Sequence, residues 1–257
     1  MSRILTVISI FVWLCGCASR DYDKTADWTA EQLYDAGRKE LARKRYDSAI
    51  DYYQKLESRF PYGGFAQQAT LELAYSQWKH ASDAEAVATC DRFIREHPKH
   101  VNVDYAHYLK GYIYLSENTG VFSFLGADLS EKDPSSLKYA FETFRELIVR
   151  YPNSKYSEDA RARMQLIVNT LADHEANVAE YYYNRGYYVA AVGRAKEVVE
   201  VYSETPAVER ALMVLVQSYQ EMGLDKLRDD SKLLLVTNFP GNDLVSEVEP
   251  KSRWKFW

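Results

Sequence analysis

Prolines recur along this 257-residue chain in a way that indicates a repeated unit. The first unit closes at Pro61 and the second at Pro98, and later units close at Pro152, Pro206 and Pro240. Ahead of each proline, small and larger apolar residues alternate at helical spacing, which is typical of a pair of short helices. One such pair cannot bury its apolar face alone, so the pattern requires a stack of pairs that share a core.

The first unit shows the pattern most completely. Its first helix carries the small residues Ala36-Gly37, and its second helix carries Tyr46, Ala49, Tyr53 and Leu56. Small residues let two helices approach where they cross, and larger residues bridge to the next pair. These positions match the tetratricopeptide consensus. The sequence therefore predicts an all-α fold, a superhelical solenoid of five tetratricopeptide-type helix pairs over residues 29–240.

The later units vary this pattern. The second carries Ala74, Ala86, Cys90 and Phe93, and the third carries Gly111, Ala140, Phe144 and Leu147. An insertion rich in Gly, Ser, Asp and Phe, residues 117–134, separates the two helices of the third unit. The fourth unit is expected from about Asp173 to Pro206. The fifth is expected from Ala207 to Pro240, where Arg228 replaces a small residue and leaves the helix crossing least defined.

The first sixteen residues are predicted to be a signal peptide. The apolar run Ile4–Trp13 is too short to span a bilayer, and Leu14-Cys15-Gly16-Cys17 follows it in the pattern of a bacterial lipoprotein box. Cys17 is the expected lipid acceptor, and residues 17–28 are the expected lipidated N-terminus and tether. Ala18, which is not an aspartate, implies anchoring in the outer membrane, facing the periplasm. Plain secretory cleavage nearby is the alternative.

Composition and motifs favour a binding protein over an enzyme. With Cys15 removed and Cys17 acylated, Cys90 is the one free cysteine expected in the mature chain, and it is predicted to be a small buried hydrophobic residue. The net charge of −5 and the interleaved charges indicate a solvated surface without a nucleic-acid footprint. The five histidines have no metal-ligand spacing, and no phosphate loop or nucleophile elbow occurs. We expect no catalytic residues, no metal and no cofactor.

Three segments carry a more specific likeness. They are FPYGGFAQQATLELAY at 60–75, DPSSLKYAFETFRELIVRYPNSKY at 133–156 and VAEYYYNRGYYVAAVGR at 178–194. With the lipoprotein box, the repeats and the insertion, they resemble the BamD (YfiO/ComL) family of lipoproteins in the outer-membrane β-barrel assembly machinery. The resemblance implies an adaptor that binds unfolded outer-membrane β-barrel proteins through their C-terminal signals, supports their insertion, and docks on BamA and BamC.

The first helices of such repeats line the concave face, which predicts a peptide-binding groove. The consensus places twelve residues there: Glu31, Tyr34, Arg38, Leu41, Gln68, Leu71, Tyr75, Trp78, Tyr105, Tyr108, Tyr112 and Leu115. The candidate substrate-peptide residues are Tyr34, Arg38, Tyr75, Trp78, Tyr105, Tyr108 and Tyr112. Tyrosine, tryptophan and arginine are enriched where binding energy concentrates. The alternative is that some of these rings, Tyr75 and Tyr108 above all, pack between repeats.

The resemblance also places BamA docking on the later repeats. It makes Arg194 the candidate for a salt bridge to an acidic group of that partner. We expect Arg194 to project from a helix end, where a guanidinium can bind a carboxylate through two hydrogen bonds. An ordinary solvated surface charge is the alternative.

Residues 241–257 are expected to form a flexible C-terminal tail that ends in Arg253-Trp254-Lys255-Phe256-Trp257. Three interpretations stay open for its aromatic residues: a contact at the membrane interface, occupation of the protein's own groove, or occasional contacts of a disordered tail. The alternative function for the whole chain is a periplasmic tetratricopeptide lipoprotein that scaffolds or regulates another cell-envelope machine, such as a peptidoglycan synthase.

Overall fold

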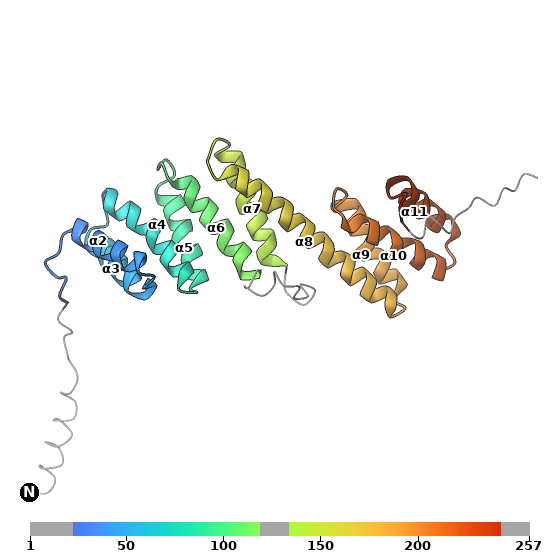
Figure 1. The fold of residues 1–257 in the computed structure, drawn as a ribbon, viewed down its shortest axis with the longest axis horizontal. Coiled ribbons are helices and arrows are strands. Elements are labelled where there is room, and N and C mark those ends of the chain that lie inside the picture. The colour runs from blue at the N-terminus through green and yellow to red at the C-terminus, as the bar shows by residue number, and fades with distance from the viewer. Residues whose placement is uncertain (1–22, 119–133, 243–257) are drawn as a thin grey trace, which may run out of the picture. The chain divides into compact units, whose positions relative to one another are not determined.

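The computed structural model describes residues 23–118 and 134–242, and these form ten helices (Figure 1). They are α2 (Ala30–Ala42), α3 (Tyr46–Arg59), α4 (Gly64–Lys79), α5 (Asp83–Glu96), α6 (Val103–Asn118), α7 (Ser135–Arg150), α8 (Ser157–Asn184), α9 (Tyr188–Val201), α10 (Ala207–Glu221) and α11 (Asp225–Asn238). Neither described range contains a strand. The all-α, tetratricopeptide-type prediction is confirmed.

Several predicted features fall wholly or largely outside the described ranges. These are the signal peptide at 1–16, the lipid acceptor Cys17, the insertion at 117–134 and the tail at 241–257. They stay predictions. Within the described ranges, no helix is both long enough and apolar enough to cross a membrane.

The chain divides into two compact units, residues 1–69 and residues 70–257, with the boundary inside α4. In the first unit α2 packs on α3. In the second unit each helix from α5 onwards packs on its successor, and α8 also contacts α10.

The turn inside a repeat has the same backbone conformation four times. Lys44, Ala81, Gly186 and Gly223 all have positive φ, between 58° and 77°. Each stands two residues before the second helix of its pair. The amide of the next residue bonds back to a carbonyl in the last turn of the first helix, as Arg45 N does to Glu40 O at 3.0 Å. This Schellman arrangement satisfies carbonyls that a helix end would leave free. It fixes where each second helix begins.

Side-chain volume is balanced where the two helices of a repeat cross. In the first and third repeats the small residue is glycine, and it faces an aromatic ring: Gly37 faces Tyr53, and Gly111 faces Phe144. A Cβ added at Gly111 would lie 2.7 Å from Phe144 Cε1. In the second and fourth repeats the corresponding pairs are Ala74 with Cys90 and Ala179 with Ala195, and all four residues are fully buried. An aromatic ring therefore fills the space opposite each glycine, whereas small residues face each other in the second and fourth repeats.

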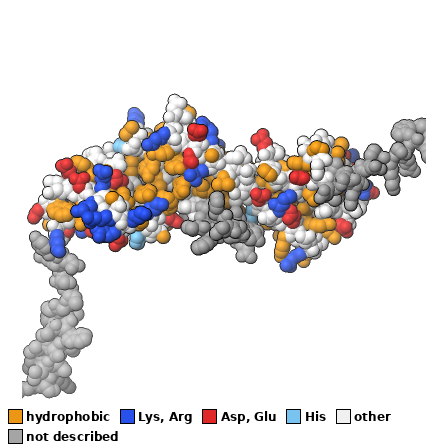
Figure 2. All heavy atoms as spheres, in the orientation of Figure 1, with side chains coloured by type: hydrophobic (Ala, Val, Ile, Leu, Met, Phe, Trp, Pro, Cys, Tyr) orange, Lys and Arg blue, Asp and Glu red, His pale blue; other side chains and the backbone are white. Residues whose placement is uncertain are grey.

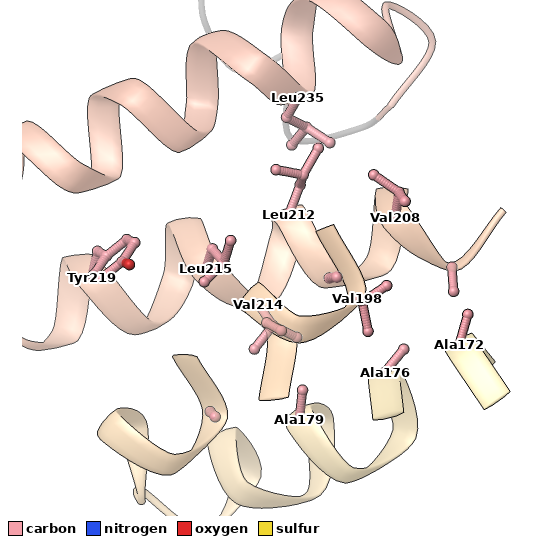
Figure 3. Close-up of a cluster of buried hydrophobic side chains, with 14 residues drawn as sticks. Ala172, Ala176, Ala179, Val198, Val208, Leu212, Val214, Leu215, Tyr219 and Leu235 are labelled. Atoms are coloured by element: carbon pink, nitrogen blue, oxygen red, sulfur yellow. The ribbon is translucent and has the colours of Figure 1, made fainter. Parts of the chain in front are cut away.

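Helix α8 departs from the predicted fourth repeat. We expected that repeat to start near Asp173, but α8 is one continuous helix of 28 residues that begins at Ser157. Its first half packs into a core with α6 and α7 that includes Ile167 and Leu171. Its second half, from Ala172, packs into a core with α9, α10 and α11. In Figure 3, Ala176 of α8 points toward Val198, and Ala179 points toward Val214. One helix thus serves two neighbouring cores.

In the fifth repeat, Arg228 stands where the pattern has a small residue, and it points to the surface. Arg228 is 29% exposed in the first turn of α11 and pairs with Asp225 and Asp229 there. The buried residues of α11 are Ser231 and Leu235 alone. The last described helix therefore presents most of its surface to solvent.

Residues 23–28 lie within the expected tether, but they pack onto α3. Arg59 binds the Asp23 carboxylate and the Thr25 carbonyl, and the ring of Trp28 stacks on Tyr52 with centroids 6.0 Å apart. Hydrogen bonds from Thr25, together with nearby Lys55 and Arg59, lower the pKa of Asp23 to about 2. The part of the tether that the structure describes is thus fixed to the first repeat.

Candidate functional site

Six aromatic side chains of the second unit form a continuous array. Each ring contacts the next, with centroid distances of 5.7 Å for Tyr75–Trp78, 5.2 Å for Trp78–Tyr112, 6.2 Å for Tyr112–Tyr108, 4.8 Å for Tyr108–Tyr156 and 5.6 Å for Tyr156–Tyr105. We call these six residues the aromatic array. All six are partly exposed. On the face shown in Figure 2, hydrophobic side chains gather over α4 to α6.

Helical spacing builds the array. Tyr105, Tyr108 and Tyr112 follow one another at three and four residues on α6, so they share one face of that helix. Tyr75 and Trp78 are three residues apart on α4. Each set therefore presents a stripe of rings, and the packing of the helices brings the stripes together.

Trp78 and Tyr112 meet at the middle of the array. Their rings are edge-to-face, with an interplanar angle of 75°, an arrangement that contributes about 0.5–1.5 kcal/mol beyond burial. The indole Nε1–H of Trp78 donates to Ser116 Oγ at 3.0 Å, and that hydroxyl donates to the Ile113 carbonyl. The indole is therefore held in one orientation while part of its ring stays accessible.

Two cations lie over the rings. Lys79 Nζ is 3.7 Å from the ring centroid of Trp78, and the guanidinium carbon of Arg163 is 4.4 Å from that of Tyr112. Arg163 also lies 6.0 Å from Tyr108. Cations at these distances are attracted by the ring faces. The array therefore combines apolar faces with positive charge.

A small polar network fixes Arg163. Its Nε donates to Asp159 Oδ2 at 2.5 Å, and the Tyr108 hydroxyl donates to the same oxygen at 2.6 Å. Burial alone would raise the pKa of Asp159, but the hydrogen bonds from Arg163 and Tyr108 outweigh burial and lower it. Burial and the bond to Asp159 raise the pKa of Tyr108. Near neutral pH the phenol therefore stays protonated and the carboxylate stays charged.

Five of the seven predicted peptide residues thus lie in one array. The other two, Tyr34 and Arg38, belong to the first unit, where the Arg38 guanidinium lies 5.8 Å from the Tyr34 ring. Tyr34 also contacts Phe65, with centroids 5.5 Å apart. Tyr75, Tyr105 and Tyr108 pack against buried clusters while remaining partly exposed, so they contribute to the core and to the surface together.

Two residues that the consensus placed on the binding face are not there. Leu71 is 2% exposed and Leu115 is 5% exposed. Both side chains belong to the cores between helices, because the buried stripe of each helix is wider than the consensus projection assumed. The expectation that they line a groove is therefore wrong.

Three residues of the site were not predicted. Tyr156 and Arg163 stand at and inside the start of α8, the stretch that the repeat pattern left unassigned, and Lys79 ends α4. The spacing of Asp159 and Arg163, four residues apart, is a helical ion-pair signal that could have indicated them.

Arg194 is not at a helix end, contrary to expectation. It lies in the middle of α9, with its side chain 44% exposed. Its Nη1 donates to Glu175 Oε2 of α8 at 2.9 Å, and Glu197 lies 4.0 Å away. The hydrogen bond to Glu175 has the largest effect in raising the pKa of Arg194. A partner carboxylate would therefore share this guanidinium with Glu175.

The array offers binding chemistry. Ring faces and cations can hold apolar side chains and carboxylates. In the described ranges, no three His, Cys, Asp or Glu side chains stand close enough to hold a metal ion. Cys90 is buried, and burial raises the pKa of its thiol to about 12, so the thiolate that a nucleophile requires does not form near neutral pH.

Comparison with known proteins gives a consistent picture. Residues 26–234 match the sequence model of the YfiO family, described as an outer membrane lipoprotein. The chain is 38% identical to the outer membrane protein assembly factor BamD of Neisseria meningitidis serogroup A, over the full length of both chains. Proteins of the same name from Xylella fastidiosa and Vibrio cholerae are 35% and 32% identical; the alignments cover 92% and 88% of this chain and 82% and 93% of theirs.

Proposed function

The chain belongs to the YfiO family of outer membrane lipoproteins, and from this premise we propose that it is a non-enzymatic assembly factor for outer-membrane proteins. Full-length similarity to proteins that carry the name assembly factor supports this role. We place it at the outer membrane, anchored through a lipid at Cys17 and facing the periplasm.

The specific task that we propose is the binding of C-terminal segments of unfolded outer-membrane β-barrel proteins. The observation that carries it is the aromatic array with Arg163 and Lys79 over its rings. An extended segment that ends in an aromatic residue can place its apolar side chains against the ring faces. Its terminal carboxylate can pair with a guanidinium already oriented by Asp159. Trp78 and Tyr112 are the central anchors.

The test is the affinity of a synthetic peptide with the C-terminal sequence of an outer-membrane barrel protein, measured by fluorescence anisotropy. Trp78→Ala with Tyr112→Ala should weaken binding at least about tenfold, since two central aromatic anchors together contribute more than about 1.4 kcal/mol. The matched control is Tyr114→Ala with Tyr139→Ala, another ring pair on α6 and α7 with centroids 5.5 Å apart. Equal affinity losses in both double variants, at unchanged helicity, would refute the site.

We further propose that the protein docks on BamA and BamC, with Arg194 contributing a charge to the BamA contact. The partly exposed Arg194 side chain and its position on a late repeat support this assignment. Because Glu175 already binds Arg194, a charge reversal at 194 would also disturb the α8–α9 packing. Neutral substitutions separate the two effects.

Arg194→Gln should reduce the recovery of BamA in an affinity pulldown about fivefold, the size expected for one ion pair at an interface rim. Glu175→Gln removes the internal partner but keeps the guanidinium, so it should leave recovery unchanged or increased. If both variants lose recovery equally, Arg194 acts on helix packing and the docking role fails.

A further inference from the structure

A second candidate site lies between α7, α8 and the end of α9. It is a pocket of about 360 Å³. Its lining consists of Lys138, Phe141, Glu142, Val168, Leu171, Val201 and Tyr202. We call it the α7–α9 pocket. Apart from Lys138 and Glu142, every lining residue is apolar or aromatic, and Val201 is 65% exposed at its edge. An apolar hollow of this size accepts one or two large side chains.

The last described residues lie beside the start of α10. After α11, Phe239 packs into the core shared by α8, α9 and α10, and the Asn242 side chain donates to Glu209 Oε1 at 2.7 Å. Glu209 is seven residues beyond Tyr202 in the sequence, so the two are separated by at most about 25 Å. The chain therefore turns back from α11 toward the α9–α10 turn, whose first residue lines the pocket.

The residues that follow have the reach and the chemistry to fill it. Trp254 is twelve residues beyond Asn242, a stretch that can span about 40 Å. Trp254, Phe256 and Trp257 stand among Arg253 and Lys255. Aromatic rings match the apolar lining. Of the two charged lining residues, Glu142 can share its carboxylate between Arg145 of α7 and a basic residue of the tail, and Lys138 lies elsewhere in the lining.

We propose that residues 253–257 of the same chain dock in the α7–α9 pocket, with an aromatic ring against Phe141, Leu171 and Tyr202 and a basic side chain beside Glu142. The pocket shares no residue with the aromatic array. The contact is therefore independent of substrate binding at the array, and failure of either proposal leaves the other standing.

Photo-crosslinking in the full chain tests this contact. With p-benzoylphenylalanine in place of Phe256, irradiation and peptide mass spectrometry should place crosslinks at residues 138–142, 168–171 and 201–202. A mixture of isotopically light and heavy chains identifies the donor and acceptor, and the crosslinks should join residues of one chain. Crosslinks to the aromatic array, to lipid, or between light and heavy chains would overturn the proposal.

Charge placed in the pocket supplies the control. Val168→Glu and Val201→Glu should each reduce the crosslink yield about tenfold, because a carboxylate in an apolar contact is strongly unfavourable. Val201 is 65% exposed, so a charge there is expected to leave the fold intact, and circular dichroism checks this. Leu166→Glu puts the same charge on α8 at a position that is 53% exposed and outside the lining, and its yield should match the wild type. Equal yields in all three variants would contradict docking in this pocket.

Discussion

At the scale of single residues, His107 is the most unusual side chain of the described structure. It is 2% exposed, and neither ring nitrogen has a hydrogen-bond partner among the described residues. The Glu146 carboxylate is 3.8 Å from Nδ1, and the Tyr151 ring lies 5.6 Å away. Burial lowers the pKa of His107. Glu146 and Asp91 oppose this shift, and Arg150 and Lys110 add to it.

The lowered pKa gives a pH dependence with a definite sign. In the unfolded chain His107 takes up a proton near its ordinary pKa of 6.5, whereas the folded protein resists protonation until the pH is lower. The unfolded state therefore binds more protons below pH 6.5, and stability falls as the pH falls through that range. Well above pH 6.5, His107 is neutral in both states and no longer lowers the free energy of unfolding.

Replacing His107 by Leu should flatten this dependence. The change removes two buried polar atoms without partners, each of which costs about 1–3 kcal/mol, so the variant should be at least as stable as the wild type at pH 5. Urea unfolding at pH 5 and pH 7.5 measures the difference. His80→Gln changes an exposed histidine and should leave the pH dependence as it is. If the leucine variant lost more stability between pH 7.5 and pH 5 than the wild type, protonated His107 would have a stabilising partner, and the prediction would be wrong.

At the scale of elements, the close crossing of α6 and α7 depends on Gly111. Gly111→Ala places a Cβ 2.7 Å from Phe144, and overpacking of this kind costs about 1–3 kcal/mol. Gly193→Ala in α9 meets nothing within 4 Å and should gain up to about 1 kcal/mol from helix propensity. Thermal unfolding should therefore shift in opposite directions. Two stabilised variants would show that the crossing adjusts freely.

The two sides of this crossing should also be coupled. Phe144→Leu replaces the ring that meets position 111 with a smaller side chain. The stability lost through this change and the stability lost through Gly111→Ala should therefore not add. The double variant is expected to lose less stability than the sum of the two single variants. Additive losses would contradict direct contact between these positions.

The elements that the sequence predicts well are those set by local residues. Gly37 and Gly111 mark the helix crossings, and both face the aromatic residue that the repeat pattern assigns them. The start of α8 was missed because the repeat template ends at Pro152 and contains no helix of 28 residues. The spacing of Ala160, Ile167 and Leu171 is helical. The local sequence does not show, however, that these residues pack onto the preceding repeat.

The same distinction holds for the aromatic array. Its stripes on α4 and α6 follow from spacing along each helix. The contribution of Tyr156 and Arg163 depends on how α8 packs against α6, through contacts between residues about 50 positions apart, such as Tyr108 with Asp159. A projection of the repeat consensus uses positions within one repeat, so it cannot predict contacts between residues this far apart in the sequence. It also placed Leu71 and Leu115 on the surface when tertiary packing buries them.

At the scale of the whole molecule, the proposed lipid anchor is tested by the two cysteines near the N-terminus. Cys17→Ser should move the protein from the membrane fraction to the soluble periplasmic fraction, because stable attachment requires more than one acyl chain. Cys15→Ser lies in the segment predicted to be removed and should leave the protein in the membrane fraction. Immunoblots of washed membranes measure both. If the Cys15→Ser protein were soluble, the lipid would be assigned to Cys15 instead of Cys17.

Helix α8 also limits how this molecule could be redesigned. Arrays of discrete repeats can be lengthened or shortened by whole units, because each boundary is a short connection that can be cut and rejoined. Here Leu171 and Ala172 are neighbours inside one continuous helix, yet they belong to different cores. The chain therefore has no boundary between repeats at that point. Deleting either flanking repeat would expose the apolar residues of one half of α8 to solvent. Insertions are best tolerated outside residues 157–184, and grafts between relatives should exchange this helix together with both of its neighbours.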